Sequence, residues 1–152
     1  MRRFAGTILV LMSFGLLALS STNANAQWVM VARAVSGQVQ QMSHKSANGN
    51  GYDVATVVLE ANADKVYAKA LSSLQAHPGI KVTKSDDKKR RIDFTNGTLE
   101  ASLQATPLGD KLSQLIIASN LTGEQPSATS LVLQGVLKVC KEVNVDCTVE
   151  GD

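Results

Sequence analysis

The sequence predicts an α+β domain in which an antiparallel sheet of four to six strands carries two helices on one face. Two observations support this class. Strand-like segments, the clearest with alternating apolar residues, follow one another between residues 80 and 119, as in an antiparallel meander. Segments with helical apolar spacing, one after Asn62 and one at Ser127–Asn144, flank these strands. The expected order is β-α-β-β-β-β-α, with Val145–Val149 available as a closing strand.

Residues 1–26 have the pattern of a cleaved export signal. Arg2 and Arg3 give the positive start, Ile8–Leu19 is the apolar run, and Ala24-Asn25-Ala26 is a small-residue cleavage site. The apolar run is too short to be a good membrane span, although a retained N-terminal anchor is the alternative. We therefore expect a periplasmic or secreted protein with no stable membrane insertion after cleavage.

The charge of the mature chain argues against two classes of partner. The whole chain carries a formal charge of +2, and Arg2 and Arg3 account for that excess. The mature chain is therefore neutral, and it contains few aromatic residues. Such a chain has no overall attraction to nucleic acid or to anionic membrane, so we expect no nucleic-acid partner.

Residues 27–51 are expected to form an N-terminal arm and linker, and residues 52–152 a single α+β domain. Three valines between residues 29 and 35 are compatible with a short strand. Gly37 and the polar residues after it favour an arm that docks late instead. The composition of Ser43–Gly51, rich in Ser, Asn and Gly, is typical of a linker.

The first strand and first helix follow from local signals. Tyr52–Glu60 is rich in β-branched residues, which favours a strand. Asn62 can cap a helix, which His77-Pro78-Gly79 then stops. One face of this helix is apolar and consists of Val66, Tyr67, Ala70, Leu71 and Leu74.

The meander is predicted as strands at Ile80–Lys84, Arg91–Thr95, Thr98–Thr106 and Lys111–Ser119. Asn96-Gly97 joins two of them, and because both residues tolerate positive φ the dipeptide favours a type I′ hairpin turn. In the third of these strands, one side is apolar and consists of Leu99, Ala101, Leu103 and Ala105.

The helix predicted at Ser127–Asn144 is apolar over much of its surface and needs a broad cover. One face consists of Ala128, Leu131, Val132, Gly135, Val136, Val139 and Val143, and Leu133 and Leu137 widen it. The residues expected to face solvent are Gln134, Lys138, Lys141 and Glu142.

Cys140 and Cys147 are expected to form a disulfide, because an exported chain meets oxidising conditions. A redox or metal pair is the alternative, but the spacing fits neither a C-x-x-C site nor a zinc ligand pair. The bridge requires a chain reversal, so we expect Asn144 to end the helix in the left-handed conformation and Val145–Val149 to return as an extended tail.

No catalytic, cofactor or metal site is predicted. His44 and His77 are the only histidines, both are expected at the surface, and no nucleotide, hydrolase or metalloprotease motif occurs. One charged hairpin turn is a possible contact surface for an acidic partner or for phosphate headgroups, and it consists of Lys88, Lys89, Arg90 and Arg91. Because Asp86 and Asp87 precede it, a self-neutralising turn that protects the strand edges is the simpler interpretation.

The run Ala61–Leu71, followed by Asp86-Asp87 before Arg91–Phe94, resembles small exported bacterial envelope proteins of unknown function. The layout of Tyr52–Cys147 is also similar to the helix-grip domains of the lipoprotein in the outer-membrane β-barrel assembly machine. The resemblance implies an envelope role without catalytic residues. The lipidated Cys of that lipoprotein has no counterpart after the expected cleavage site.

Three functions follow as hypotheses. The first is a non-catalytic domain, without a cofactor, that contacts an envelope protein or surface in the periplasm or outside the cell. The second is a carrier of a small apolar ligand between the sheet and the long helix, indicated by the apolar excess at Leu133 and Leu137. The third, an enzyme, has as its best candidates only the polar residues of Thr83–Arg91.

Overall fold

The computed structural model of the chain describes residues 35–45, 47, 50–121 and 131–149. The expected export signal, most of the predicted crossover after Asn120 and the first residues of the predicted long helix lie outside these ranges. Within them, no helix is long and apolar enough to cross a membrane. The helices and strands are β1 (Gln38–Lys45), β2 (Gly51–Leu59), α2 (Ala63–Gln75), β3 (Lys81–Asp86), β4 (Arg91–Thr95), β5 (Glu100–Gly109), β6 (Leu112–Leu121), α3 (Leu131–Val143) and β7 (Thr148–Val149).

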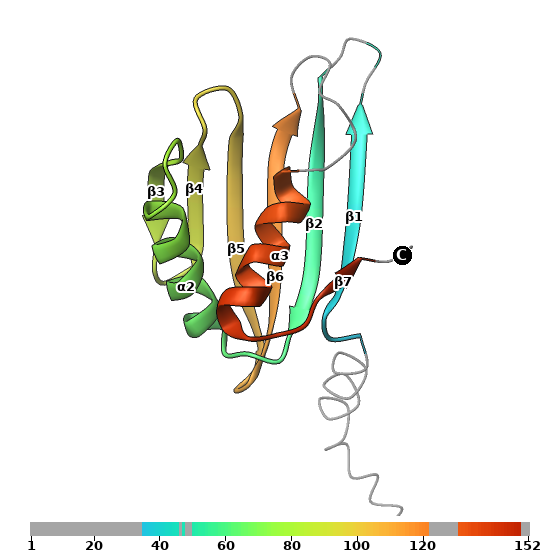
Figure 1. Cartoon of the computed structure of the whole chain (residues 1–152), viewed down its shortest axis with the longest axis vertical. Coiled ribbons are helices and arrows are strands. Elements are labelled where there is room, and N and C mark those ends of the chain that lie inside the picture. Colours follow the sequence, from blue (N-terminus) through green and yellow to red (C-terminus); the bar gives the residue numbers. More distant parts are fainter. Residues whose placement is uncertain (1–34, 46, 48–49, 122–130, 150–152) are drawn as a thin grey trace, which may run out of the picture.

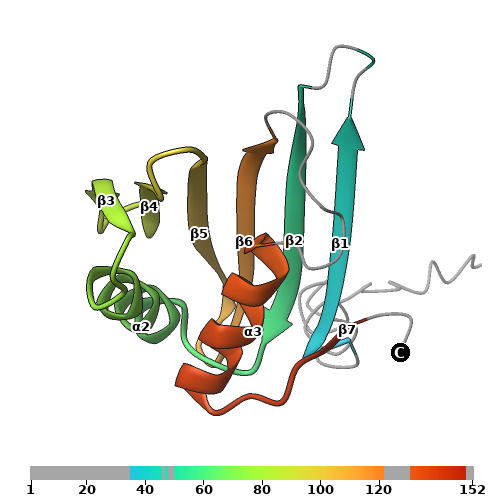
Figure 2. The same cartoon turned by 45° about the horizontal axis from the view of Figure 1, so that its top comes forward.

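The strands form one seven-stranded sheet in the order β3-β4-β5-β6-β2-β1-β7, and both helices cover the same face (Figure 1). All neighbouring strands are antiparallel except β1 and β7, which are parallel. The predicted α+β class is confirmed, with more strands than expected. Figure 2 shows α2 on the side of β3 and β4, and α3 further along the sheet toward β2.

The expectation of an arm and linker before Tyr52 is wrong for Gln38–Lys45, which is a strand of the sheet. Its Val39 is fully buried opposite Val57. Two of its polar side chains donate hydrogen bonds to the buried carboxylate of Asp53 on β2, Gln41 at 3.0 Å and Ser43 at 2.6 Å. Polar partners of a buried carboxylate do not produce the alternating apolar pattern by which strands are recognised.

Helix α2 begins and ends where the sequence indicates. The side-chain oxygen of Asn62 accepts hydrogen bonds from the backbone N–H groups of Asp64 and Lys65, at 2.8 and 3.4 Å. These bonds satisfy donors that the first turn of a helix leaves free. Ala76 is the C-cap, directly before His77-Pro78-Gly79.

The turn between β4 and β5 is not the predicted two-residue type I′ turn. Thr95 pairs with Glu100, so the connection consists of residues 96–99, and of these only Gly97 has a positive φ, of 95°. The side-chain oxygen of Asn96 accepts from the N–H groups of Thr98 and Leu99, at 3.1 and 2.8 Å. Because this asparagine turn stabilises the loop and Leu99 is buried, a longer connection replaces the tight hairpin.

The core is a single layer between the sheet and the two helices. The predicted alternation in β5 is confirmed, with Leu103 and Ala105 buried and Ala101 half-buried on the helix side. The inner face of α3 consists of Val132, Val136, Val139, Cys140 and Val143. Leu131 was expected on this face but is 52% exposed, because it lines an open part of the layer.

The predicted disulfide between Cys140 and Cys147 is present, and its α-carbons are 6.1 Å apart. Asn144 ends α3 with a φ of 60°, and the chain then reverses as expected. The tail reaches the sheet as β7, where Thr148 donates its N–H to the carbonyl oxygen of Gly37 at 2.8 Å. Gly37 itself has a φ of 80°, and a Cβ there would collide with the carbonyl oxygen of Asp146. The C-terminal end of α3 is therefore joined both to its tail and, through the tail, to the sheet.

Candidate ligand-binding site

The four basic residues predicted as a contact surface lie around the turn between β3 and β4. Arg90 donates from Nε to a carboxylate oxygen of Asp64 on α2 at 2.6 Å, and this hydrogen bond raises the pKa of Arg90. Arg91 pairs with Asp93 in the same way at 2.9 Å. Lys88 and Lys89 are exposed. Two of the four cations are thus already engaged within the chain.

A second contact fixes this turn to α2. The hydroxyl of Tyr67, which is only 7% exposed, donates to a carboxylate oxygen of Asp87 at 2.5 Å. Burial, together with this hydrogen bond, raises the pKa of Tyr67 to about 12. Since the neutral phenol is the form that donates, the contact is maintained over the whole physiological pH range. The turn therefore holds the first half of α2 in place.

The structure separates the two histidines. His44 lies on β1 with its ring 5.6 Å from the ring of Tyr52, measured between centroids. His77 follows α2, and its Nδ1 lies 2.8 Å from the carbonyl oxygen of Pro78. Across the described ranges, no group of three His, Cys, Asp or Glu side chains could hold a metal ion.

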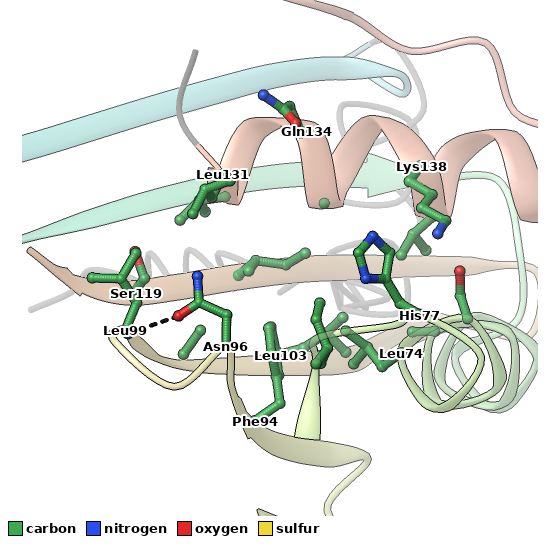
Figure 3. Close-up of a pocket in the computed structure, with 18 of the residues that line it drawn as sticks. Leu74, His77, Phe94, Asn96, Leu99, Leu103, Ser119, Leu131, Gln134 and Lys138 are labelled. Atoms are coloured by element: carbon green, nitrogen blue, oxygen red, sulfur yellow. Dashed lines mark hydrogen bonds between the residues drawn. The ribbon is translucent and has the colours of Figure 1, made fainter. Parts of the chain in front are cut away.

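A cavity of about 350 Å³ lies between the two helices and the sheet. Its walls come from the second half of α2, the segment after it, β4 to β6 and α3 from Leu131 to Val139. Figure 3 shows the side chains of Phe94, Leu99 and Leu103 along the sheet, with Leu74 on α2 and Leu131 on α3. The cavity is therefore mainly apolar. Its mouth is formed by the exposed residues of the lining, which are His77, Pro78, Gly79, Asn96, Leu131, Gln134 and Lys138.

Small residues leave the space open. Ala70 on α2, Ala101 on β5 and Gly135 on α3 all line the cavity. A Cβ at Gly135 would come within 3.2 Å of the Cδ1 atom of Ile117 on the opposite wall. Larger side chains at these three positions would extend into the space between helices and sheet. The small size of these three residues therefore keeps the cavity open.

Polar groups lie at two ends of the cavity. Lys138 on α3 and His77 after α2, both exposed, extend toward one another at one end (Figure 3). Asn96 and Ser119 lie at the other end, beside Leu99. No carboxylate occurs among the described residues that line the cavity.

The sequence indicated a groove under the long helix but assigned it to the wrong residues. Leu133 and Leu137 are half-buried and pack against the core, and neither lines the cavity. Lys138 was expected to face solvent, and it does, but at the mouth of the cavity. Gly135 and Ala101 could have indicated the cavity from the sequence. Both are small residues on faces predicted to pack together, where larger apolar residues usually fill a core.

Comparisons with known proteins inform the fold only. No known family model and no curated protein matches the chain. A solved structure of a conserved protein of unknown function, EF2215 from Enterococcus faecalis, matches with a TM-score of 0.51 at 8% identity, over 76% of this chain and 80% of that chain. The Zhui aromatase/cyclase from Streptomyces sp. R1128 matches with a TM-score of 0.37 at 13% identity, over 69% and 84%. The first match shows a shared fold, and the second is too distant to support an argument.

Proposed function

We propose that the protein binds a small apolar ligand in the cavity between α2, α3 and the sheet, without changing it chemically. The observation that carries the proposal is the cavity itself, whose volume of about 350 Å³ falls within the range of small-molecule pockets. A water-sized group occupies about 30 Å³ in a liquid, so the cavity accommodates about a dozen such groups. That is the size of a short aliphatic or a small aromatic molecule.

Leu131 supports this function from the mouth of the cavity. Its side chain lines the cavity yet is 52% exposed, although it belongs to a helix whose other inward residues are buried. An apolar ligand would remove this side chain and the apolar walls from water, which is the driving force for binding. The lining offers neither a thiol nor a carboxylate among the described residues, which favours binding over catalysis.

The expected location fits a carrier that works outside the cytosol. A disulfide such as Cys140–Cys147 is typical of oxidising compartments, so we place the protein in the periplasm or outside the cell. The expectation of an envelope protein or surface as partner remains a prediction. An envelope partner would receive or supply the ligand, in keeping with the resemblance to exported envelope proteins.

The function can be tested by filling the cavity with a larger side chain. Ala101→Phe adds a large side chain to the lining, whereas Ser102→Phe adds the same side chain at the neighbouring position of β5, which faces the other side of the sheet. Octan-1-ol is titrated into each isotopically labelled protein, and amide NMR shifts report binding. We expect saturable shifts around the cavity in the unmodified protein and in Ser102→Phe, and at least about tenfold weaker binding in Ala101→Phe.

Two results would contradict the proposal. One is the absence of any saturable shift in the unmodified protein. The other is equal binding by Ala101→Phe and Ser102→Phe, since the site would then lie elsewhere. Thermal unfolding of both variants checks that each remains folded.

A further inference from the structure

We infer that the ligand is a single-chain amphiphile with an anionic head group, whose head lies beside Lys138 and whose tail fills the cavity. This inference rests on the proposed function and adds the chemical class of the ligand. It depends on three observations on the described residues: Lys138 at the mouth has no ion-pair partner among them, the lining that they form contains no carboxylate, and the opposite end offers only uncharged polar groups.

Lys138 is a cation with no ion-pair partner in the described part of the chain. Its side chain is exposed and lines the cavity at the mouth. Glu142 lies one turn further along α3, but the ion pairs found among the described residues are Arg90–Asp64 and Arg91–Asp93. A lysine in this position can lay its aliphatic stem along an apolar wall while its ammonium group stays hydrated. An anionic head group at the mouth would meet this charge without being buried.

Among the described residues, the rest of the cavity lining offers no competing negative charge. His77 faces Lys138 across the same end, and it can carry a positive charge but not a negative one. The described lining contains no Asp or Glu. A cationic head group would therefore be repelled by Lys138 and would find no carboxylate in the described lining, and a neutral one would gain no charge pairing. Charge complementarity selects the anion.

The opposite end is less suited to a charged head group. Asn96 is exposed at this end, but it carries no charge, and its side-chain oxygen is already the acceptor for the N–H groups of Thr98 and Leu99. Ser119 is only 7% exposed, so a charge placed there would lose its hydration. Between this end and Lys138 the walls are apolar, with Phe94 and Leu103 prominent (Figure 3). An amphiphile therefore gains most by lying with its tail inward and its head at Lys138.

The test compares three ligands with the same eight-carbon chain: octanoate, octan-1-ol and octyltrimethylammonium. Dissociation constants are measured by the same NMR titration at pH 7.5 and low salt. We expect octanoate to bind about three- to fivefold more tightly than octan-1-ol, as for an exposed charge pair, and octyltrimethylammonium to bind most weakly. At high salt the ratio of the dissociation constants of octan-1-ol and octanoate should approach one.

The variant Lys138→Glu tests whether the preference for octanoate comes from the charge of Lys138. Lys141→Glu is the matched control on the same helix, because Lys141 is exposed but does not line the cavity. We expect Lys138→Glu to prefer octan-1-ol over octanoate, a change of about tenfold in the ratio of their dissociation constants. Lys141→Glu should keep the original order. Binding of octan-1-ol by each variant shows that it is folded.

The outcomes separate the inference from the function on which it rests. If octan-1-ol and octanoate bind equally and Lys138→Glu changes neither, the anionic head group is overturned while the apolar site stands. If Lys138→Glu and Lys141→Glu weaken octanoate equally, the effect is one of net charge and the position at Lys138 is overturned. If none of the three ligands binds, the proposed function itself fails.

Discussion

Each of the two described helices, α2 and α3, has one end that is fixed and one end that lines the cavity. The first half of α2 is held by the Asn62 cap and by the contact between Tyr67 and Asp87. The last turn of α3 is held by Cys140–Cys147. The other halves of both helices form the walls of the cavity, where Gly135 faces Ile117 and Leu131 is exposed.

This difference shows how a small domain can combine a stable fold with an open site. The cap, the hydrogen bond and the disulfide that hold the helices act at the first half of α2 and at the last turn of α3. Where the helices line the cavity, small residues and an exposed leucine replace close packing. Stability and binding should therefore respond to different substitutions, and three predictions test whether they do.

The largest difference is expected between two leucines. Leu115 on β6 is fully buried and lies outside the cavity lining, so Leu115→Ala should lower the free energy of unfolding by about 2–5 kcal/mol. Leu131→Ala should change it by less than about 0.5 kcal/mol, because that side chain is half exposed. Urea titrations followed by circular dichroism measure both. Equal losses would show that the cavity end is packed like the rest of the core.

The disulfide should affect stability without affecting binding. Its closed loop is short, so the loop-entropy estimate for the double variant Cys140→Ser, Cys147→Ser is a loss of about 2–3 kcal/mol. A thermal scan should show a lower midpoint for this variant, and reductant should have the same effect on the unmodified protein. Octan-1-ol affinity measured well below the transition should stay the same. A stable variant that no longer binds octan-1-ol would contradict the proposal that the disulfide end of α3 contributes to stability and not to binding.

The smallest effect is expected at Tyr67. Its folded pKa of about 12 lies above the unfolded value of about 10, so the stabilisation is complete below pH 10 and is lost as the pH rises through 12. Absorbance at 295 nm in a Tyr52→Phe background follows Tyr67 alone and should titrate near pH 12. At pH 7, Tyr67→Phe should cost about 0.5–1.5 kcal/mol and leave octan-1-ol affinity unchanged. A midpoint near pH 10 would contradict the burial of Tyr67 together with its contact with Asp87.

Features set by local rules could be predicted from the sequence, whereas features that depend on how distant segments meet could not. The Asn62 cap, the helix end at Asn144 and the disulfide each follow from residues within a few positions of one another. Strand β1 could not be recognised, because its polar side chains bond to Asp53 on another strand. The tight turn at Asn96-Gly97 was overridden by the burial of Leu99.

The cavity shows the same limit. Its apolar character could be inferred from the alternation in β5 and the breadth of α3, but its position depends on how the second half of α2 lies relative to α3. The sequence correctly placed Lys138 in contact with solvent. That this lysine stands at the mouth of a cavity, opposite His77, follows only from the packing of three segments that are distant in the chain.

The short strand β7 has a consequence for how the chain reaches its final state. Its pairing with β1 joins opposite ends of the described chain, and the entropy lost in closing a loop grows with the logarithm of its length. Most of that loss has already occurred once α3 is docked, because only residues 144–147 separate α3 from β7 and the disulfide holds Cys147 beside Cys140 on the helix. Until the tail arrives, the backbone groups at the start of β1, beside Gln38 and Val39, are open to pairing with other chains. The bridge therefore favours pairing of the tail with the start of β1 over pairing of these two residues with another chain.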